Sequence, residues 1–273
     1  MFKIKHGAQH LQGSKLYIKD AWRTPLAEFG LQDGCDWLTL EPGSPVSISN
    51  RVKAYKVQLS DKTNIYFKTY SFHGQTFDYF MRSSKCAVEV NSYQTLEEIG
   101  IPTIEPLAFG EDRISGALKS CFIVTKSIDD TLPLDDFAYQ VWYNMEAEEK
   151  KQAFEEIFDE IVKYTRMAHD AGFFHYDLKW RNILVKKIDG HYKTFWIDCP
   201  RGRKSSLRET RGRMVDLSCL ARLALSYLSK SQRYRFLARY MDDAPRAEVR
   251  KMWNLVDDHL SRRLPDPVKF PED

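Results

Sequence analysis

The sequence predicts an α+β protein of two lobes, with a small β-rich N-terminal lobe containing one main helix and a mostly helical C-terminal lobe. Short runs rich in β-branched and aromatic residues occur up to residue 126, whereas apolar residues recur at helical spacing further along the chain. The polar stretch TKSIDDTLP separates the two patterns and is typical of a connector. We therefore place the lobes at residues 1–125 and 126–273.

Two β-rich runs in the N-terminal lobe predict an antiparallel hairpin. Val52 to Leu59 supply the first run and IYFKTY, residues 65–70, supplies the second, with a turn-like stretch between them. Because side chains alternate along a strand, Lys68 lies on the face opposite Phe67. Residues 1–40 show no sustained period, so we assign no elements there.

A helix over about residues 83–99 follows the hairpin. Ser83 or Ser84 can cap its N-terminus, and Gly100 supplies a C-terminal stop. This helix carries Glu89. A short apolar run, CFIV, then predicts a strand that leads into the connector.

The C-terminal lobe opens with a long amphipathic helix, in which apolar residues recur at three- and four-residue steps from Phe154 to Ala168. Gly172 ends this helix. Two β-like runs, NILVKK and KTFWID, come next, and the DG pair between them predicts a tight hairpin. Helical pattern returns after Arg213.

The strongest functional signal is HYDLKWRNILV, residues 175–185, followed by WIDCPRG, residues 196–202. Protein kinases place an Asp and an Asn five residues apart on a loop and a second Asp beyond a hairpin, and Asp177, Asn182 and Asp198 have these spacings. The pattern therefore predicts a protein-kinase-like fold that uses ATP and Mg²⁺. The catalytic loop would span residues 175–185 and the metal-binding turn residues 198–202.

Each residue of this pattern has an expected role. Asp177 would accept the proton of the acceptor hydroxyl, while Asn182 and Asp198 would hold Mg²⁺ against the nucleotide phosphates. Lys179 would neutralise charge on the phosphoryl group during transfer. The alternative is that these are ordinary turn and capping residues. The order of helix, loop, hairpin and acid favours the phosphotransferase.

Lys68 and Glu89 extend the pattern into the N-terminal lobe, because kinases use a strand lysine paired with a helix glutamate to grip the nucleotide phosphates. Taken alone, Lys68 would be a solvent-facing strand lysine and Glu89 a helix-surface charge, and Glu97 and Glu98 on the same helix compete for the glutamate's role. We also assign Thr125, together with Lys126 beside it, to the nucleotide site.

Asp216 has two interpretations of equal weight. It opens an apolar helical run, and kinases use such an Asp to hydrogen-bond the backbone of the catalytic loop. It could equally be an acid at the N-terminus of a helix, where the dipole favours it.

A basic segment, RGRKSSLRETRGR, follows the metal-binding turn where a kinase binds its acceptor. We take Arg201, Arg203 and Lys204 as candidate acceptor-binding residues, because guanidinium groups bind anionic sugars and lipid surfaces well. A solvated basic loop is an equally weighted alternative. His73, His169 and His175 have no metal-ligand spacing, so we expect packing roles for them.

Composition excludes several classes of protein. With 43% hydrophobic and 29% charged residues, the chain is of the globular class. A formal net charge of +3 is too small to indicate nucleic-acid binding, so we expect no nucleic-acid partner. The five scattered cysteines, and a first segment without an apolar run, indicate a cytoplasmic protein. Peripheral attachment to a membrane stays open.

Between about residues 45 and 225 the chain resembles the Kdo/WaaP family of bacterial lipopolysaccharide kinases, including its InaA-like members. The matching stretches, in the family's order, are IYFKTY, RSSKCAVEVNSYQTLEEIGIPTIEPLAFGE, FIVTKSID, HYDLKWRNILV and WIDCPRG. The resemblance implies transfer of the ATP γ-phosphate to a sugar hydroxyl, of Kdo or heptose, in the lipopolysaccharide inner core. It also implies work at the cytoplasmic face of a Gram-negative inner membrane.

Three departures from ordinary protein kinases have consequences. SISNRV replaces the glycine-rich loop, so phosphate coverage would rely on backbone or on residues 49–51. Tyr176 replaces the arginine that receives an activation-loop phosphate, which disfavours that switch. Cys199 and Pro200 follow the metal-binding Asp, and proline should stiffen this turn.

Three other functions remain as alternatives. An atypical protein kinase would use the same catalytic residues on a protein hydroxyl. A small-molecule kinase of the aminoglycoside or choline type would need a more acidic acceptor pocket. A nucleotide-binding pseudokinase module is disfavoured by the intact catalytic pattern. The acceptor sugar and the oligomeric state are not predicted.

Overall fold

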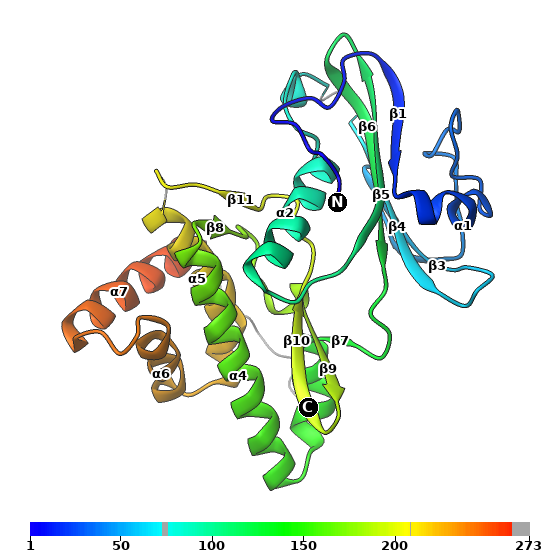
Figure 1. The fold of residues 1–273 in the computed structure, drawn as a ribbon. Helices are drawn as coiled ribbons and strands as arrows, with labels where there is room; N and C mark the ends of the chain where they lie inside the picture. The colour runs from blue at the N-terminus through cyan, green and yellow to red at the C-terminus, as the bar shows by residue number, and fades with distance from the viewer. Residues whose placement is uncertain (73–75, 208, 264–273) are drawn as a thin grey trace. The chain divides into compact units, whose positions relative to one another are not determined.

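The computed structural model describes residues 1–72, 76–207 and 209–263 (Figure 1). The chain forms two compact units. The first comprises Met1–Thr95 and Thr103–Asp129, and the second comprises Leu96–Pro102 and Asp130–Asp273. Each is described on its own below.

The first unit is built on a six-stranded antiparallel sheet with the strand order β1-β5-β6-β4-β3-β2 (Figure 1). The strands are β1 (Gly13–Ile18), β2 (Ser44–Ile48), β3 (Val52–Gln58), β4 (Asn64–Ser71), β5 (Pro106–Ile114) and β6 (Ala117–Lys126). The hairpin predicted from the two β-rich runs is the β3–β4 pair. One face of β4 is buried through Ile65 and Phe67, which pack with Trp37 and Phe122 in the core of this unit.

The region to which the sequence assigned no elements contains β1 and the short helix α1 (Arg23–Ala27). β1 is an edge strand paired only with β5, and its first three residues are exposed. An edge strand with so little burial needs no alternating apolar pattern, which explains why its sequence gave no signal.

The main helix of the first unit is α2 (Lys85–Ile99), which continues into the second unit at Leu96. Ser84 caps it, since its Oγ accepts a hydrogen bond of 3.1 Å from the amide of Ala87. Gly100 follows the helix with φ of 84°, a left-handed conformation that favours glycine. Both ends agree with the prediction.

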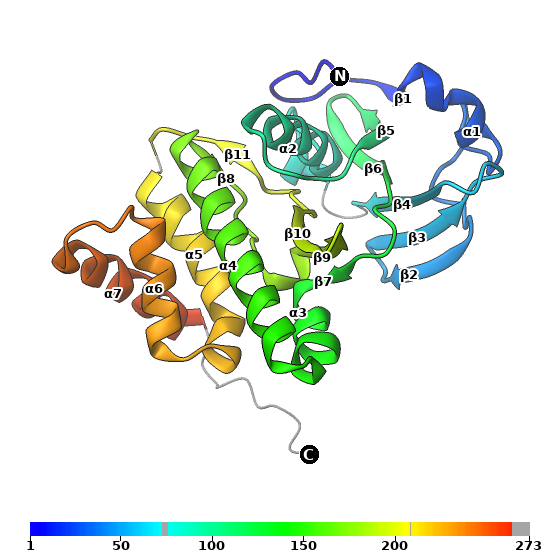
Figure 2. The ribbon, with the colours of Figure 1, turned by 60° about the horizontal axis from the view of Figure 1, so that its bottom comes forward.

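The second unit is mostly helical (Figure 2). Its helices are α3 (Leu134–Asp136), α4 (Ala147–Asp170), α5 (Glu209–Tyr227), α6 (Lys230–Tyr240) and α7 (Arg246–Arg263). Short strands are β7 (Leu132–Pro133), β8 (Phe173–Phe174), β9 (Ile183–Ile188), β10 (His191–Trp196) and β11 (Arg203–Lys204). Phe158, Leu217 and Leu237 belong to an apolar core shared by α4, α5, α6 and α7.

The β9–β10 hairpin positions two segments of the catalytic pattern. Its turn is made by Asp189 and Gly190, with φ of 50° and 83°, as the DG pair predicts. Ile183 pairs with Trp196 at the open end, and the amide of Ile197 donates to the carbonyl of Asn182 at 2.9 Å. The hairpin therefore ends with Asn182 beside the segment that leads into Asp198.

Helix α5 begins at Glu209, four residues before the predicted return of helical pattern at Arg213. Its first residues are charged and exposed, so apolar periodicity cannot reveal them. Asp216 consequently lies in the body of α5, and its interpretation as an acid at the helix N-terminus is wrong. Among the described residues, no helix combines the length and apolar character needed to cross a membrane.

Candidate active site

In the first unit, Lys68 of β4 lies next to Glu89 of α2. The Lys68 Nζ and a Glu89 carboxylate oxygen are 3.9 Å apart, and the glutamate is buried whereas the lysine is partly exposed. Tyr93, one turn further along α2, donates a 2.7 Å hydrogen bond to the other carboxylate oxygen of Glu89. A buried, oriented carboxylate beside a partly exposed ammonium is the arrangement that leaves the lysine able to reach a phosphate.

The competing glutamates on α2 have different surroundings. Glu97 and Glu98 are both exposed, and Glu98 lies 4.0 Å from Lys204. Of the three glutamates, only Glu89 faces Lys68, so burial identifies the partner that the sequence left ambiguous.

Tyr70 shares the face of β4 that bears Lys68. The Lys68 ammonium lies 5.3 Å from the centroid of the Tyr70 ring, a cation–π distance. Burial, reinforced by the nearby Glu89 carboxylate, raises the pKa of Tyr70 well above its usual value. The Tyr70 phenol is therefore neutral, and its ring lies against the Lys68 ammonium group.

Thr125 and Lys126 are the last two residues of β6. Thr125 is buried, Lys126 is exposed, and the Lys126 amide already donates to the carbonyl of Glu105 at 2.9 Å. The amide of Ser127 likewise donates to Asn64. A nucleotide base at this strand end would have to use carbonyl groups or side chains rather than these two amides.

In the second unit, Asp177, Lys179 and Asn182 form one cluster. Lys179 Nζ lies 2.6 Å from a carboxylate oxygen of Asp177. The side-chain amide of Asn182 donates to the Asp177 carbonyl at 2.8 Å and to its carboxylate at 3.4 Å. Asp177 is thus held from two sides while part of its carboxylate stays accessible.

The backbone of the catalytic loop is fixed by Asp216. Its carboxylate accepts hydrogen bonds from the amides of His175 and Tyr176, at 2.8 Å and 2.7 Å. Tyr176 has φ of 61°, a left-handed conformation that is costly for a non-glycine residue. The buried carboxylate offsets this cost, which agrees with the kinase interpretation of Asp216.

Asp216 is itself oriented by a chain of buried polar groups that the sequence did not reveal. Arg213 donates to the Tyr240 hydroxyl at 2.8 Å, and Tyr240 lies 2.8 Å from His169 Nδ1. The other ring nitrogen of His169 is 3.2 Å from Asp216. With Arg213 as donor, Tyr240 donates to Nδ1 and Nε2–H donates to Asp216. Burial raises the pKa of Tyr240 to about 12, despite Arg213.

A magnesium ion would be held by Asn182 and Asp198. The Asn182 amide nitrogen is engaged with Asp177, which leaves its Oδ1 as an oxygen ligand. Asp198 is partly exposed and has φ of 58°. The described residues contain no cluster of three His, Cys, Asp or Glu side chains that could hold a metal alone. Two oxygen ligands suit Mg²⁺, which takes its remaining ligands from phosphates and water.

The basic segment begins as a strand rather than a free loop. β11 pairs with β8, so that Arg203 is opposite Phe174 and Lys204 opposite Phe173. The Arg203 guanidinium lies 4.6 Å from the centroid of the Tyr176 ring. Arg201, Arg203 and Lys204 are exposed, whereas Arg213 is occupied by Glu209, Asp170 and Tyr240. Arg208 lies outside the described residues, as does His73.

The structure thus assembles the expected residues as two sets, Lys68 with Glu89 in the first unit and Asp177 with Lys179 and Asn182 in the second. Tyr93 and Tyr240 are supporting residues that sequence reasoning missed, and His169, for which only a packing role was expected, also hydrogen-bonds to Asp216 and Tyr240. Tyr93 lies four residues after Glu89, a spacing that indicates a shared helix face. Nothing local in the sequence connects His169 with Tyr240.

Comparison with known proteins gives a family and a fold. The model of a family described as "Lipopolysaccharide kinase (Kdo/WaaP) family" matches residues 51–240. The solved structure "WaaP in complex with acyl carrier protein" is similar with a TM-score of 0.70 at 20% sequence identity, over 93% of this chain and 100% of that chain. No curated protein sequence gives a match. The predicted kinase-like fold is confirmed by this similarity.

Proposed function

Because this chain belongs to the Kdo/WaaP family of lipopolysaccharide kinases, we propose that it transfers the γ-phosphate of ATP to a hydroxyl of Kdo or heptose in the lipopolysaccharide inner core. The family makes the chain a kinase of lipopolysaccharide biosynthesis. The nucleotide, the metal and the acceptor sugar are our proposal, as is work at the cytoplasmic face of a Gram-negative inner membrane.

The held but accessible carboxylate of Asp177 is the observation that best supports this chemistry. Asp177 accepts the proton of the acceptor hydroxyl while the oxygen of that hydroxyl forms a bond to the γ-phosphorus of ATP. The bond between the γ-phosphorus and the oxygen that bridges it to the β-phosphate breaks, and ADP leaves. Lys179, 2.6 Å from Asp177, is placed to neutralise charge on the transferred phosphoryl group. Mg²⁺, when bound by Asn182 and Asp198, would neutralise charge on the phosphates.

The exposed basic residues after the metal-binding turn support an anionic glycolipid as acceptor. Arg201, Arg203 and Lys204 carry three positive charges on one short segment, and Arg203 is oriented by its stacking on Tyr176. Lipopolysaccharide inner core is rich in carboxylates and phosphates, which guanidinium groups bind in bidentate fashion. A protein acceptor without acidic groups would not need such a segment.

The test is ATP consumption by the purified chain with Mg²⁺, with and without dephosphorylated inner-core lipopolysaccharide. We expect stimulation by the acceptor that is lost in Asp177→Ala, while Arg201→Gln with Arg203→Gln raises the KM for lipopolysaccharide and leaves the KM for ATP unchanged. Stimulation by a generic protein substrate instead would favour the atypical protein kinase, and nucleotide binding with no turnover would favour the pseudokinase.

We also propose that the second unit binds the acyl chain of an acyl carrier protein. An apolar cavity of about 140 Å³ lies among α3, α4, α5, α6 and α7, lined by side chains such as Phe137, Trp142, Ala221 and Trp253. The lining of this cavity is mostly apolar, which suits an apolar ligand. The similar WaaP structure contains an acyl carrier protein, which makes an acyl chain a natural occupant.

Acylated and unacylated carrier protein distinguish this proposal from surface binding. We expect the acylated form to raise the thermal midpoint of the chain and the unacylated form to do so much less. Ala221→Phe, which fills the cavity from α5, should abolish that difference. Equal stabilisation by both carrier forms would contradict an acyl site.

A further inference from the structure

We propose that the first unit contains a phosphate-binding pocket formed by Arg51, Arg82 and Lys85. The three residues come from separate places, the β2–β3 turn, the segment before α2 and the first turn of α2. All three line one cavity of about 370 Å³. The proposal rests on the proposed kinase activity only for the source of the phosphate.

The part of the chain that the structure describes places no carboxylate in an ion pair with Arg51, Arg82 or Lys85. Asp78 also lines the cavity and is the one acid of its lining, so the lining carries a net charge of +2. Like charges that converge without neutralisation repel one another, and an anion relieves this repulsion.

The lining also offers a hydroxyl. Ser71 lines the cavity at the end of β4, and its Oγ is buried with no hydrogen-bond partner among the described residues. Its amide donates to the carbonyl of Arg51 at 2.9 Å, which ties the β2–β3 turn to β4. A buried hydroxyl without a partner is costly, and a rotation of this side chain toward the cavity would let a phosphate oxygen satisfy it.

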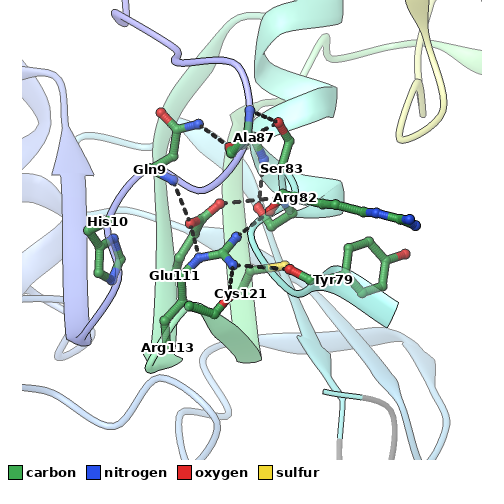
Figure 3. Close-up of polar contacts among 12 residues, drawn as sticks. Gln9, His10, Tyr79, Arg82, Ser83, Ala87, Glu111, Arg113 and Cys121 are labelled. Atoms are coloured by element: carbon green, nitrogen blue, oxygen red, sulfur yellow. Dashed lines mark hydrogen bonds and ion pairs between the residues drawn. The ribbon is translucent and has the colours of Figure 1, made fainter. Parts of the chain in front are cut away.

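A buried ion pair fixes the segment that presents Arg82 (Figure 3). Glu111 and Arg113, both fully buried, are 2.7 Å apart. Arg113 also donates to the carbonyls of Arg82 and Tyr79, at 2.8 Å and 3.3 Å, and Glu111 accepts from the amide of Ser84 at 3.4 Å. Figure 3 shows the Arg82 side chain extending away from the ion pair, on the side of Tyr79.

This anchoring removes most of the ordering cost of binding. The backbone from Tyr79 to Ser84 is held by the ion pair, and Gly7 adds hydrogen bonds to the hydroxyl of Ser83. For Arg82, only the outer part of the side chain has to be ordered when a ligand binds, and its guanidinium already makes one long hydrogen bond, of 3.5 Å, to the carbonyl of Asp78. Preorganised donors of this kind bind more tightly than donors on a loose loop.

The pocket adjoins the residues assigned to the nucleotide. Tyr70 lines it, and the ammonium groups of Lys85 and Lys68 each lie 5.3 Å from the centroid of the Tyr70 ring. The ligand is therefore a terminal phosphate group close to Lys68. Two sources have this chemistry, the terminal phosphate of ATP and a phosphate already present on the acceptor.

The experiment measures binding of inorganic phosphate, ATP, AMP and glucose 6-phosphate to the full chain by calorimetry. We expect Arg82→Gln with Lys85→Gln to weaken phosphate binding by about tenfold or more, the loss that one or two charge-assisted hydrogen bonds would give. Lys56→Gln, an exposed lysine on β3 outside the pocket, is the control for charge alone. Unchanged thermal midpoints show that the variants fold.

The ligands separate the sources. If the double variant binds ATP more weakly but binds AMP as the wild type does, the pocket is supported and its ligand is the terminal phosphate of ATP. If the double variant loses affinity for glucose 6-phosphate alone, the pocket is supported and its ligand is a phosphate on the acceptor. Unchanged binding of all four ligands, or losses equal to those in Lys56→Gln, overturns the pocket. If the wild-type chain binds phosphate through these residues but never consumes ATP, the pocket stands and the proposed kinase activity falls.

Discussion

At the scale of single residues, the active-site carboxylates are controlled by neighbours that sequence spacing does not single out. Glu89 is selected over two exposed glutamates by its burial beside Lys68 and by the hydroxyl of Tyr93. Asp216 is held by His169 on one side and holds the catalytic-loop backbone on the other. These contacts fix the orientation of the Glu89 and Asp216 carboxylates.

Tyr93→Phe should weaken nucleotide binding without unfolding the chain. The change removes the 2.7 Å hydrogen bond to Glu89 and leaves a buried carboxylate oxygen short of a donor, which allows Glu89 to turn from Lys68. We expect the KM for ATP to rise by about three- to tenfold, the effect of one hydrogen bond to a charged group. Steady-state kinetics measures it, with Tyr143→Phe, an exposed tyrosine of the second unit, as the control. An unchanged KM would mean that Tyr93 does not orient Glu89.

At the scale of elements, packing between α5 and β8 depends on one glycine. Gly212 lies inside α5, where a Cβ would lie 2.3 Å from the ring of Phe174. Phe174 in turn belongs to β8, which pairs with the strand that begins the basic segment. A helix interior normally favours alanine over glycine. Glycine at this position therefore lowers the helix propensity of α5 but allows the helix to pack closely against the Phe174 ring.

Gly212→Ala should therefore destabilise the chain although alanine favours helices. Overpacking of this kind costs about 1–3 kcal/mol, more than the gain of about 1 kcal/mol in helix propensity. Urea unfolding measures the difference. Phe174→Ala removes the Cγ and Cδ atoms that the new methyl group would meet, so it should cost less in the Gly212→Ala background than in the wild type. If Gly212→Ala alone stabilises the chain, the Phe174 ring can move aside at little cost in free energy.

The pairing of α4 with β10 predicts an acid-sensitive step in stability. Burial alone would raise the pKa of Glu156, but hydrogen bonds from the Tyr192 amide, Gln152 and His191 lower it to about 2. A group with a lowered folded pKa stabilises above its unfolded pKa of about 4.3, and this contribution is lost as the pH falls toward 2.

Thermal midpoints measured between about pH 5 and pH 2 test this linkage. The wild-type midpoint should fall across that window more steeply than the midpoint of Glu156→Gln, which has no carboxylate to protonate. Glu148→Gln, an exposed acid of the same helix, should follow the wild type. If the thermal midpoints of all three proteins fall in parallel with pH, Glu156 does not contribute to the loss of stability in acid.

At the scale of the whole molecule, two apolar cores among the described residues share no residue. One includes Ile65 and Phe122 in the first unit, and the other includes Val162 and Leu237 in the second. Cavity-forming changes in separate cores have no common neighbours through which to interact. Each core therefore contributes its own part of the free energy of unfolding.

Ile65→Val and Val162→Ala should consequently destabilise additively. Ile65→Val is expected to cost about 0.5–1.5 kcal/mol and Val162→Ala about 1–3 kcal/mol, and their coupling energy should stay within about 0.5 kcal/mol. Denaturant unfolding of the two single variants and the double variant closes the cycle. A larger coupling energy would reveal that the two cores respond as one.

The parts of the fold that sequence predicts are those whose signals are local. The β3–β4 hairpin, both ends of α2 and the DG turn each depend on residues close in the chain. The edge strand β1 and the start of α5 were not predicted, because neither has apolar residues at a regular spacing. Spacing likewise placed Asp177 and Asn182, whereas Tyr240, 71 residues from His169, could be joined to the site only by the fold.

The basic segment is tied down at both ends. β11 holds Arg203 and Lys204 against β8, and the amide of Ser205 bonds to Gly172, while Arg213 is anchored by Asp170 and Tyr240. Of the described residues between these anchors, Ser206 and Leu207 are exposed, so substitutions there should leave both anchors in place. The segment can therefore vary in sequence at these positions while Arg203 and Arg213 keep their contacts.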